Sequence, residues 1–244
     1  VSVPVAFSAW TLGIPIVVHE QTVVSGLANR IVSLIADFVA ISFPTSKTFF
    51  PEEKTIVTGN LLRRNIFEIA KKRKKQKSNP PILYITGGSR GSLIINKNIL
   101  QVIEKLLSKF VIYHQTGEID FKRTEKIKFK LSKEQKSRYN IAANFTFDAV
   151  DKIFKEADLV ISRAGANTVS EIALLGIPAI FVPITKTDSN EQYKNAKILS
   201  DLGIAEIIEE KIFSTSTLLD CVDKILNNYP KYKKNSLQAK KLIP

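Results

Sequence analysis

The chain has 244 residues, 44% of them hydrophobic, with a net charge of +13, which is enough length for one large or two modest domains. The single cysteine, Cys221, excludes an internal disulfide framework and fits a reducing compartment. No apolar run approaches the length of a membrane span, and no signal peptide opens the chain. Because methionine is absent even at position 1, we interpret the chain as a piece of a longer protein, cut at both ends.

Strands and helices alternate from the start of the chain. The pattern predicts strands over residues 14–19, 38–42 and 55–58, with a helix over 26–35. Such alternation is typical of parallel α/β units. The charged segment 63–81, which ends in Asn-Pro-Pro, is predicted to be a linker.

A second alternation follows this linker. Strands are predicted over residues 82–86, 110–114, 139–145, 159–161, 178–182 and 205–208, and helices over 93–107, 150–156 and 191–202. We therefore predict two doubly wound parallel sheets, the first of them incomplete. The predicted bounds are 1–62 for the first domain, 63–81 for the linker and 82–244 for the second domain.

The most informative segment runs from Ser162 to Glu171, with the sequence SRAGANTVSE. It leads from a buried-looking strand through a glycine-bearing turn into a helix. Backbone N–H groups at a helix start favour an anion such as a diphosphate. Glu171 lies about two turns into the helix, where a carboxylate can accept hydrogen bonds from a ribose diol. Together these features predict a nucleotide-sugar site.

A second glycine-bearing turn, Gly87-Gly88-Ser89-Arg90-Gly91-Ser92, also connects a predicted strand to a helix. Its backbone can approach a phosphate closely, and the Ser89 hydroxyl is a further donor. By itself this motif is weak, so an ordinary tight turn remains an alternative.

Polar residues follow two further predicted strands. His19, Glu20 and Gln21 lie at the sheet edge where ligands of open α/β sheets collect, although His19 can also simply cap backbone groups. Glu191 and Gln192 begin a helix, and their carboxylate and amide suit sugar hydroxyls. An ordinary polar helix start, capped by Asp188 or Ser189, is the alternative there.

Basic residues are concentrated at 71–77 and near the C-terminus. A solvated linker and helix face account for them most simply. Attraction to an anionic membrane surface is the next interpretation. Nucleic acid is excluded as a partner because no recognition motif or aromatic platform accompanies the basic run.

The motifs occur in a characteristic order along nearly the whole chain: His19-Glu20-Gln21, Gly59-Asn60, Gly87-Gly88-Ser89-Arg90-Gly91, Ser162-Arg163-Ala164-Gly165-Ala166 with Ser170-Glu171, Phe181-Val182-Pro183 and Gln192-Tyr193-Lys194-Asn195-Ala196. This set resembles the MurG family of bacterial transferases, which add N-acetylglucosamine from UDP-GlcNAc to lipid I and so make lipid II for peptidoglycan. The resemblance implies the two-domain GT-B fold and an inverting transfer that needs no metal or other cofactor. The implied partners are UDP-GlcNAc, lipid I and the anionic cytoplasmic face of the plasma membrane.

Carried over position by position, the resemblance implies a donor site of Arg63, Gly87, Gly88, Ser89, Gly91, Phe147, Ala164, Gly165, Glu171, Glu191 and Gln192. Glu171 would hold the ribose hydroxyls, Ser89 and its turn the diphosphate, and Phe147 would lie beside uracil. Arg63 would reach the nucleotide from the domain junction. Gln192, and Glu191 in place of a usual amide, would contact the GlcNAc hydroxyls. His19, Glu20, Gln21 and Asn96 would face the interdomain cleft.

The chain departs from the family pattern near its ends. The family's N-terminal glycine-rich loop, with the proposed catalytic base, lies upstream of Val1. A second such loop is expected to overlap residues 1–6, which keep only its Ser and Pro, and this puts binding of the acceptor diphosphate in doubt. The C-terminal helix that returns to the first domain is also expected to be missing. We therefore expect this chain to bind the donor but to turn over lipid I poorly or not at all.

Two other functions remain open. One is another GT-B enzyme that uses a UDP-sugar, such as a UDP-GlcNAc 2-epimerase. The other is a non-catalytic module that binds nucleotide sugars. A nicotinamide-dependent oxidoreductase is disfavoured because residues 87–92 lack the G-x-G-x-x-G spacing.

Overall fold

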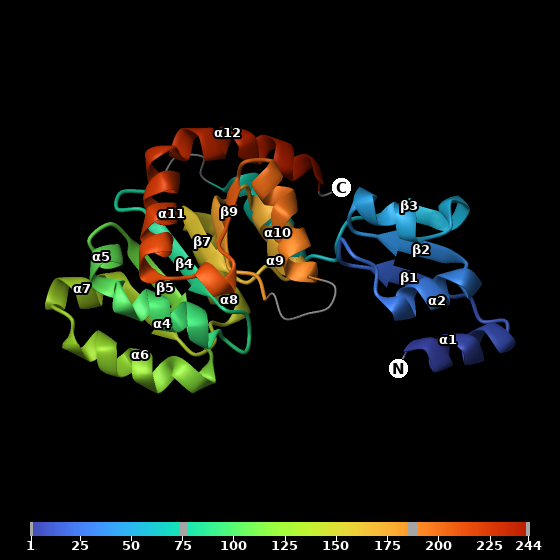
Figure 1. Cartoon of the computed structure of the whole chain (residues 1–244), viewed down its shortest axis with the longest axis horizontal. Helices are drawn as coiled ribbons and strands as arrows, with labels where there is room; N and C mark the ends of the chain where they lie inside the picture. The colour runs from blue at the N-terminus through green and yellow to red at the C-terminus, as the bar shows by residue number, and fades with distance from the viewer. Residues whose placement is uncertain (1, 74–77, 185–189, 243–244) are drawn as a thin grey trace.

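The computed structural model describes residues 2–73, 78–184 and 190–242, and it contains two separate parallel β-sheets (Figure 1). The first sheet has the strand order β1-β2-β3, and the second has the order β6-β5-β4-β7-β8-β9. All strand pairs in both sheets are parallel. The predicted α/β class is confirmed. Within the described part of the chain, no helix is both long and apolar enough to cross a membrane.

The three-stranded sheet lies at the right of Figure 1, with two helices beside it. Its elements are α1 (Ser2–Thr11), β1 (Val17–Glu20), α2 (Leu27–Ile35), β2 (Phe38–Ile41) and β3 (Thr55–Val57), with 3-10 turns at Pro44–Phe49 and Glu52–Lys54. A small core of Ala6, Val18, Val32, Ala36, Val39, Ile41 and Phe50 holds them together.

Residues Ser2–Thr11 form helix α1, whereas the family resemblance led us to expect that a loop overlaps residues 1–6. The expectation of a loop is therefore wrong from Ser2 onward. The segment contains no glycine that would favour a loop. Pro4 lies in the first turn of α1, where backbone N–H groups have no intrahelical partner and a missing N–H costs little. The expected strand over residues 14–19 begins only at Val17, after Pro15.

Part of the predicted linker is also helical. Residues Arg64–Lys72 form α3, which contacts α8 and α9 of the larger unit. Ile66 is fully buried, and Phe67 and Ile69 pack beside it. These apolar residues recur among charged ones at helical spacing, a pattern that the high charge of the segment hid. The domain bounds at residues 62 and 82 stay predictions.

The larger unit follows the predicted strand–helix alternation closely. Its elements are β4 (Ile82–Thr86), α4 (Leu93–Gln101), α5 (Ile103–Leu107), β5 (Val111–Gln115), α6 (Glu118–Lys130), α7 (Lys133–Arg138), β6 (Tyr139–Ala142), α8 (Phe147–Glu156), β7 (Leu159–Ser162), α9 (Ala166–Leu175), β8 (Ala179–Phe181), α10 (Glu191–Asp201), β9 (Ala205–Ile207), α11 (Thr215–Asn227) and α12 (Tyr229–Ala239). The helix predicted over 93–107 is divided at Val102, whose backbone leaves the helical conformation. The pattern did not predict α6, α7, α11 or α12.

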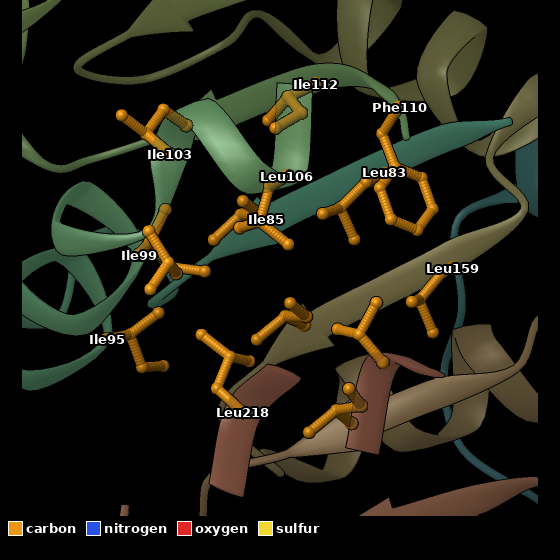
Figure 2. Close-up of a cluster of buried hydrophobic side chains, with 14 of the residues drawn as sticks. Leu83, Ile85, Ile95, Ile99, Ile103, Leu106, Phe110, Ile112, Leu159 and Leu218 are labelled. Atoms are coloured by element: carbon orange, nitrogen blue, oxygen red, sulfur yellow. The ribbon is translucent and has the colours of Figure 1, made fainter. Parts of the chain in front are cut away.

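Helices cover both faces of the six-stranded sheet. On one face, Leu83 and Ile85 of β4 point toward Ile95 and Ile99 of α4, with Leu218 of α11 nearby (Figure 2). Tyr84, between those two β4 residues, points to the other face and meets Phe154 of α8 edge-on, with ring centroids 5.6 Å apart. Burial on both faces explains why the strands read as continuous apolar runs.

The strand order places a reversal in the middle of the sheet. From β4 the chain moves outward through β5 and β6, and it then returns to the other side of β4 as β7. In open α/β sheets, ligands bind outside the carboxyl ends of the strands at such a switch point. The turns that follow β4 and β7 are therefore the first place to look for a site.

Candidate functional site

The two predicted glycine turns lie side by side at this switch point. β4 and β7 are paired in parallel, with Thr86 opposite Ser162, so the turns that follow them leave the same edge of the sheet. Each turn leads directly into a helix, α4 or α9, whose first N–H groups face that edge. Two helix N-termini at one crevice make a favourable environment for a diphosphate.

The turn after β4 is held by hydrogen bonds that its own N–H groups donate. The Gly88 N–H donates to Thr86 Oγ1 at 3.0 Å, and the Gly91 N–H donates to the Gly88 carbonyl at 3.0 Å. Gly88 and Gly91 both have positive φ angles, +84° and +74°. Ser89, at the tip, is exposed. Its hydroxyl is therefore accessible to a ligand.

The turn after β7 offers backbone rather than side chains. Ala164 is fully buried, and its carbonyl accepts a hydrogen bond from Asn195 at 3.3 Å. Gly165 precedes α9 without any side-chain cap, and the space around its Cα is open. Arg163 is directed away, since it bonds the Val182 carbonyl at 2.8 Å and Glu210 at 2.5 Å. An anion at this turn would therefore meet main-chain N–H groups.

Three residues distant in sequence meet beside α9. The Arg63 guanidinium lies 2.9 Å from Asp151 Oδ1 and 4.0 Å from Glu171 Oε1. It also lies 5.0 Å from the centroid of the Phe147 ring, which is otherwise exposed. The structure thus brings together Arg63, Phe147 and Glu171, three residues of the predicted donor site, whose roles stay predictions. Asp151 was not predicted, although it falls one turn after Phe147 on the same helix.

Glu171 is tuned by its surroundings. Its side chain is only 17% exposed, and burial raises the pKa of its carboxyl to about 7. The positive charge of Arg63 lowers this pKa, and the negative charge of Asp151 raises it. A carboxyl with this pKa changes its charge near neutral pH. Perturbed pKa values of this kind cluster at functional sites, although structural ion pairs also produce them.

The start of α10 carries the predicted sugar-binding pair. Gln192 Oε1 accepts from the Ile184 N–H at 3.1 Å, so that end of its amide is already used. Glu191 is half-buried, and burial, with the charge of Glu20, raises the pKa of its carboxyl. Asn190 precedes the helix with a φ of 48° and no side-chain cap. The alternative caps, Asp188 and Ser189, lie outside the described residues.

Asn96 does not face the interdomain cleft as predicted. It is 1% exposed, and its Nδ2 donates to the Thr116 carbonyl and to Asp120 Oδ2, both at 2.8 Å. Its Oδ1 lies 3.0 Å from His114 Nε2. The reason is helix periodicity, which turns position 96 of α4 inward onto the sheet rather than along its edge.

The residues at the end of β1 are also mostly structural. Glu20 is 4% exposed, and its two oxygens accept from Thr22, Gly26 and Asn29, which fixes the loop before α2. Glu20 is thus engaged within its own loop, although its charge still acts on Glu191 of the larger unit, so its place at the interdomain cleft stays a prediction. His19 Nε2 lies 3.2 Å from the Gly59 carbonyl, which is the backbone-capping alternative. Gln21 is exposed.

Direct contacts join the two units near this site. Asn60 Nδ2 donates to Asn167 Oδ1 at 2.8 Å, which ties the end of the first unit to the first turn of α9. Asn195 Oδ1 accepts from the Val23 N–H at 3.2 Å. The same Asn195 side chain bonds Ala164, so it connects the loop after β1 with the turn after β7. The sequence motif contained Asn195, but its role as a bridge follows only from the fold.

The profile of the glycosyltransferase family 28 C-terminal domain matches residues 82–243, more than half of the chain. The chain belongs to glycosyltransferase family 28.

This family-28 chain has relatives over nearly its whole length. A protein of Blochmanniella pennsylvanica is 39% identical over 92% of the chain and is named UDP-N-acetylglucosamine–N-acetylmuramyl-(pentapeptide) pyrophosphoryl-undecaprenol N-acetylglucosamine transferase. The crystal structure of Acinetobacter baumannii MurG is 28% identical, covers 98% of the chain and has a TM-score of 0.74. The chain spans only 62% of the first protein and 66% of the second. The resemblance to the MurG family and the GT-B-like fold are confirmed.

Epimerases share the fold of this family-28 chain as well. UDP-GlcNAc 2-epimerase from Neisseria meningitidis, solved with UDP-GlcNAc bound, has a TM-score of 0.64, and it covers 96% of this chain and 67% of its own. Its sequence identity is only 13%, which shows the fold alone. The arrangement of the sheets therefore does not separate a transferase from an epimerase.

Proposed function

We propose that this chain carries the donor-binding part of an inverting transferase that moves N-acetylglucosamine from UDP-GlcNAc to lipid I, forming lipid II in peptidoglycan synthesis. The observation that carries the proposal is the convergence of Glu171, Arg63 and two helix N-termini at the switch point between β4 and β7. The name of the Blochmanniella relative supports the choice of donor and acceptor.

In the proposed site, different residues contact different parts of the donor. Glu171 accepts hydrogen bonds from the ribose hydroxyls, and Phe147 lies on the uracil side. The turn at Gly87, Gly88, Ser89 and Gly91 holds the diphosphate together with the N–H groups at Gly165 and the start of α9. Gln192 and Glu191 approach the sugar from α10.

The geometry favours departure of UDP. In the proposed reaction the acceptor hydroxyl oxygen bonds C1 of GlcNAc from the side opposite UDP, and the bond from C1 to the diphosphate oxygen breaks. Negative charge then grows on the β-phosphate, where preorganised N–H donors stabilise it most. Arg63 supplies a positive charge at the same crevice. The acceptor's proton needs a base, and no residue of this chain is assigned that role.

Calorimetric titration tests the donor assignment. UDP-GlcNAc is expected to bind this chain with higher affinity than UDP-glucose, and NAD is expected not to bind. The reason is that a site built for sugar hydroxyls and an acetamido group discriminates through groups left unpaired by the wrong ligand. Equal binding of all three ligands would contradict the assignment. Product analysis with UDP-GlcNAc alone separates the epimerase alternative, since epimerisation needs no lipid acceptor.

We also propose that the whole protein works at the anionic cytoplasmic face of the plasma membrane. A polyprenyl acceptor resides in a membrane, and the net charge of +13 favours an anionic surface. The chain is expected to co-sediment with vesicles containing phosphatidylglycerol but not with pure phosphatidylcholine vesicles, and less so at high salt. Equal sedimentation with both vesicle types would contradict an electrostatic attraction.

A further inference from the structure

Gln115, the last residue of β5, connects two loops of the proposed donor site. Its Nε2 donates to the Gly88 carbonyl at 3.3 Å, and its Oε1 accepts from the Phe145 N–H at 3.2 Å. Gly88 belongs to the turn after β4, and Phe145 to the loop between β6 and α8. Because β5 lies between β4 and β6, Gln115 extends the pairing of three strands beyond their ends. Gln115 itself is 8% exposed, whereas its two partners are more accessible to water.

The backbone next to Gln115, at Thr116, is held by a series of buried hydrogen bonds. The Thr116 carbonyl lies against Gly91, so closely that a Cβ on Gly91 would overlap it. Asn96 Nδ2 holds that carbonyl at 2.8 Å, and Asn96 Oδ1 accepts from His114 Nε2 at 3.0 Å. His114 is fully buried, and burial lowers its pKa to about 3, so it is neutral. Its Nδ1 then accepts from the Tyr139 hydroxyl at 2.8 Å. Every polar atom in this chain of contacts has a partner, as a rigid support requires.

The two loops that Gln115 joins have different tasks in the proposed function. The turn at Gly88 to Gly91 meets the diphosphate, and the loop at Phe145 leads into Phe147 on the uracil side. We propose that Gln115 is a positioning residue that holds these two walls at the spacing of a uridine diphosphate. This inference rests on the proposed donor site and adds to it a residue that touches no ligand.

Glutamine suits this position because it carries a donor and an acceptor on one planar group. Leucine has neither, so Gln115→Leu removes the hydrogen-bond partner of the Gly88 carbonyl and of the Phe145 N–H. An ionised glutamate accepts from Phe145 but presents a second acceptor to the Gly88 carbonyl. A protonated glutamic acid again has one donor and one acceptor. Burial raises the pKa of a carboxyl, which brings that protonation into an accessible pH range.

The test compares UDP binding by calorimetry at pH 8 and at pH 5.5, each variant against the unaltered chain at the same pH. Gln115→Leu is expected to bind UDP about tenfold more weakly at both pH values, since two hydrogen bonds of modest strength are lost. Gln115→Glu is expected to bind at least as weakly as that at pH 8 and to recover most of the loss at pH 5.5. Gln101→Leu, an exposed glutamine on α4, is the matched control and is expected to bind normally.

The outcomes separate the two proposals. Recovery of Gln115→Glu binding at low pH supports positioning by a donor–acceptor pair when thermal melting shows that the variant is folded at both pH values, because protonation of a buried carboxyl also stabilises the fold. Unchanged affinity of Gln115→Leu, or no recovery of Gln115→Glu, overturns the role of Gln115 and leaves the donor site standing. Absence of UDP binding by the unaltered chain overturns the donor site and this inference with it. If Gln115→Leu does not fold, as judged by thermal melting, the two pH values for Gln115→Glu still decide.

Discussion

Glu171→Gln is expected to weaken UDP binding by roughly 10- to 100-fold at pH 8. A carboxylate that accepts hydrogen bonds from the ribose diol contributes about 1.5–3 kcal/mol, the range for bonds to a charged group. Glutamine keeps the shape but offers one neutral acceptor and an N–H₂ group in place of two charged oxygens. The same variant has no such carboxylate to protonate, so its UDP affinity should lose the pH dependence described next.

The pH dependence of the unaltered chain follows from the pKa of Glu171. Because burial raises this pKa to about 7, the carboxylate is present above pH 7 and is lost as the pH falls through that value. UDP affinity is therefore expected to decrease from pH 8 to pH 6 more steeply in the unaltered chain than in Glu171→Gln. Comparing the UDP affinities of the two proteins at each pH cancels the effect of the ionisation of UDP itself.

The same substitution is expected to stabilise the free protein. Between the ordinary pKa of about 4.5 and the folded pKa of about 7, the folded state binds more protons than the unfolded state, so stability falls as pH rises. The loss of stability caused by the ionised, buried Glu171 is complete above pH 7 and absent below about pH 4.5. Removing it should raise the unfolding free energy by about 1–3 kcal/mol at pH 8, or the melting temperature by several degrees.

Calorimetry and thermal melting of Glu171→Gln measure both effects, and Glu125→Gln on the exposed face of α6 is the control. Weaker binding combined with higher thermal stability is the expected signature of a functional carboxyl held at a cost in stability. UDP affinity equal to that of the unaltered chain would remove Glu171 from the ribose-binding role. Lower thermal stability at pH 8 would instead mean that Arg63 outweighs the burial of Glu171.

Gly91→Ala is expected to destabilise the fold by about 2–5 kcal/mol. Gly91 has a φ of +74°, a conformation that costs an L-residue about 1–2 kcal/mol. A Cβ there would also overlap the Thr116 carbonyl, which Asn96 prevents from retreating, and such overpacking costs about 1–3 kcal/mol. The melting temperature should fall by roughly 4–20 °C, and UDP binding should be lost with the displaced turn.

Gly88→Ala is the matched control for Gly91→Ala. Gly88 has a similar φ of +84°, but nothing lies within 4 Å of a Cβ placed there. Only the backbone cost of about 1–2 kcal/mol then remains. Thermal melting of both variants isolates the contribution of close packing against Thr116. Equal melting temperatures would show that the turn can move away from β5, which would also weaken the argument for a rigid support.

Much of the larger unit was predictable because its strands are buried on both faces. Runs such as Ile82-Leu83-Tyr84-Ile85 and Leu159-Val160-Ile161 are apolar at every position, and each is followed by glycine before a helix. Local composition is sufficient for such strands and turns. The helices α6 and α7 were not predicted, because charged residues dominate them and little of either helix is buried. The hydrophobic residues of α3 were obscured by neighbouring lysines in the same way.

In the candidate site too, local sequence motifs could be read from the sequence, whereas contacts between distant residues could not. Glu171, the Ser89 turn and the start of α9 could be proposed from sequence alone, since each belongs to a contiguous motif whose backbone and side chains would carry the chemistry locally. Asn96 was misplaced because sequence position does not say which side of α4 faces the sheet. Asp151 and Gln115 were missed because each acquires its role from partners far away in sequence, at Arg63 and at Gly88 and Phe145.

The sequence by itself therefore determined the α/β class, the order of the motifs and the turns that we propose to meet a diphosphate. Those properties depend on residues within about ten positions of one another. Only the tertiary structure decided that the Arg63 guanidinium pairs with Asp151, that Glu20 supports a loop, and that Gln115 joins two loops of the proposed site. These roles depend on which strands become neighbours, and the strand order β6-β5-β4-β7 follows from packing across the whole sheet.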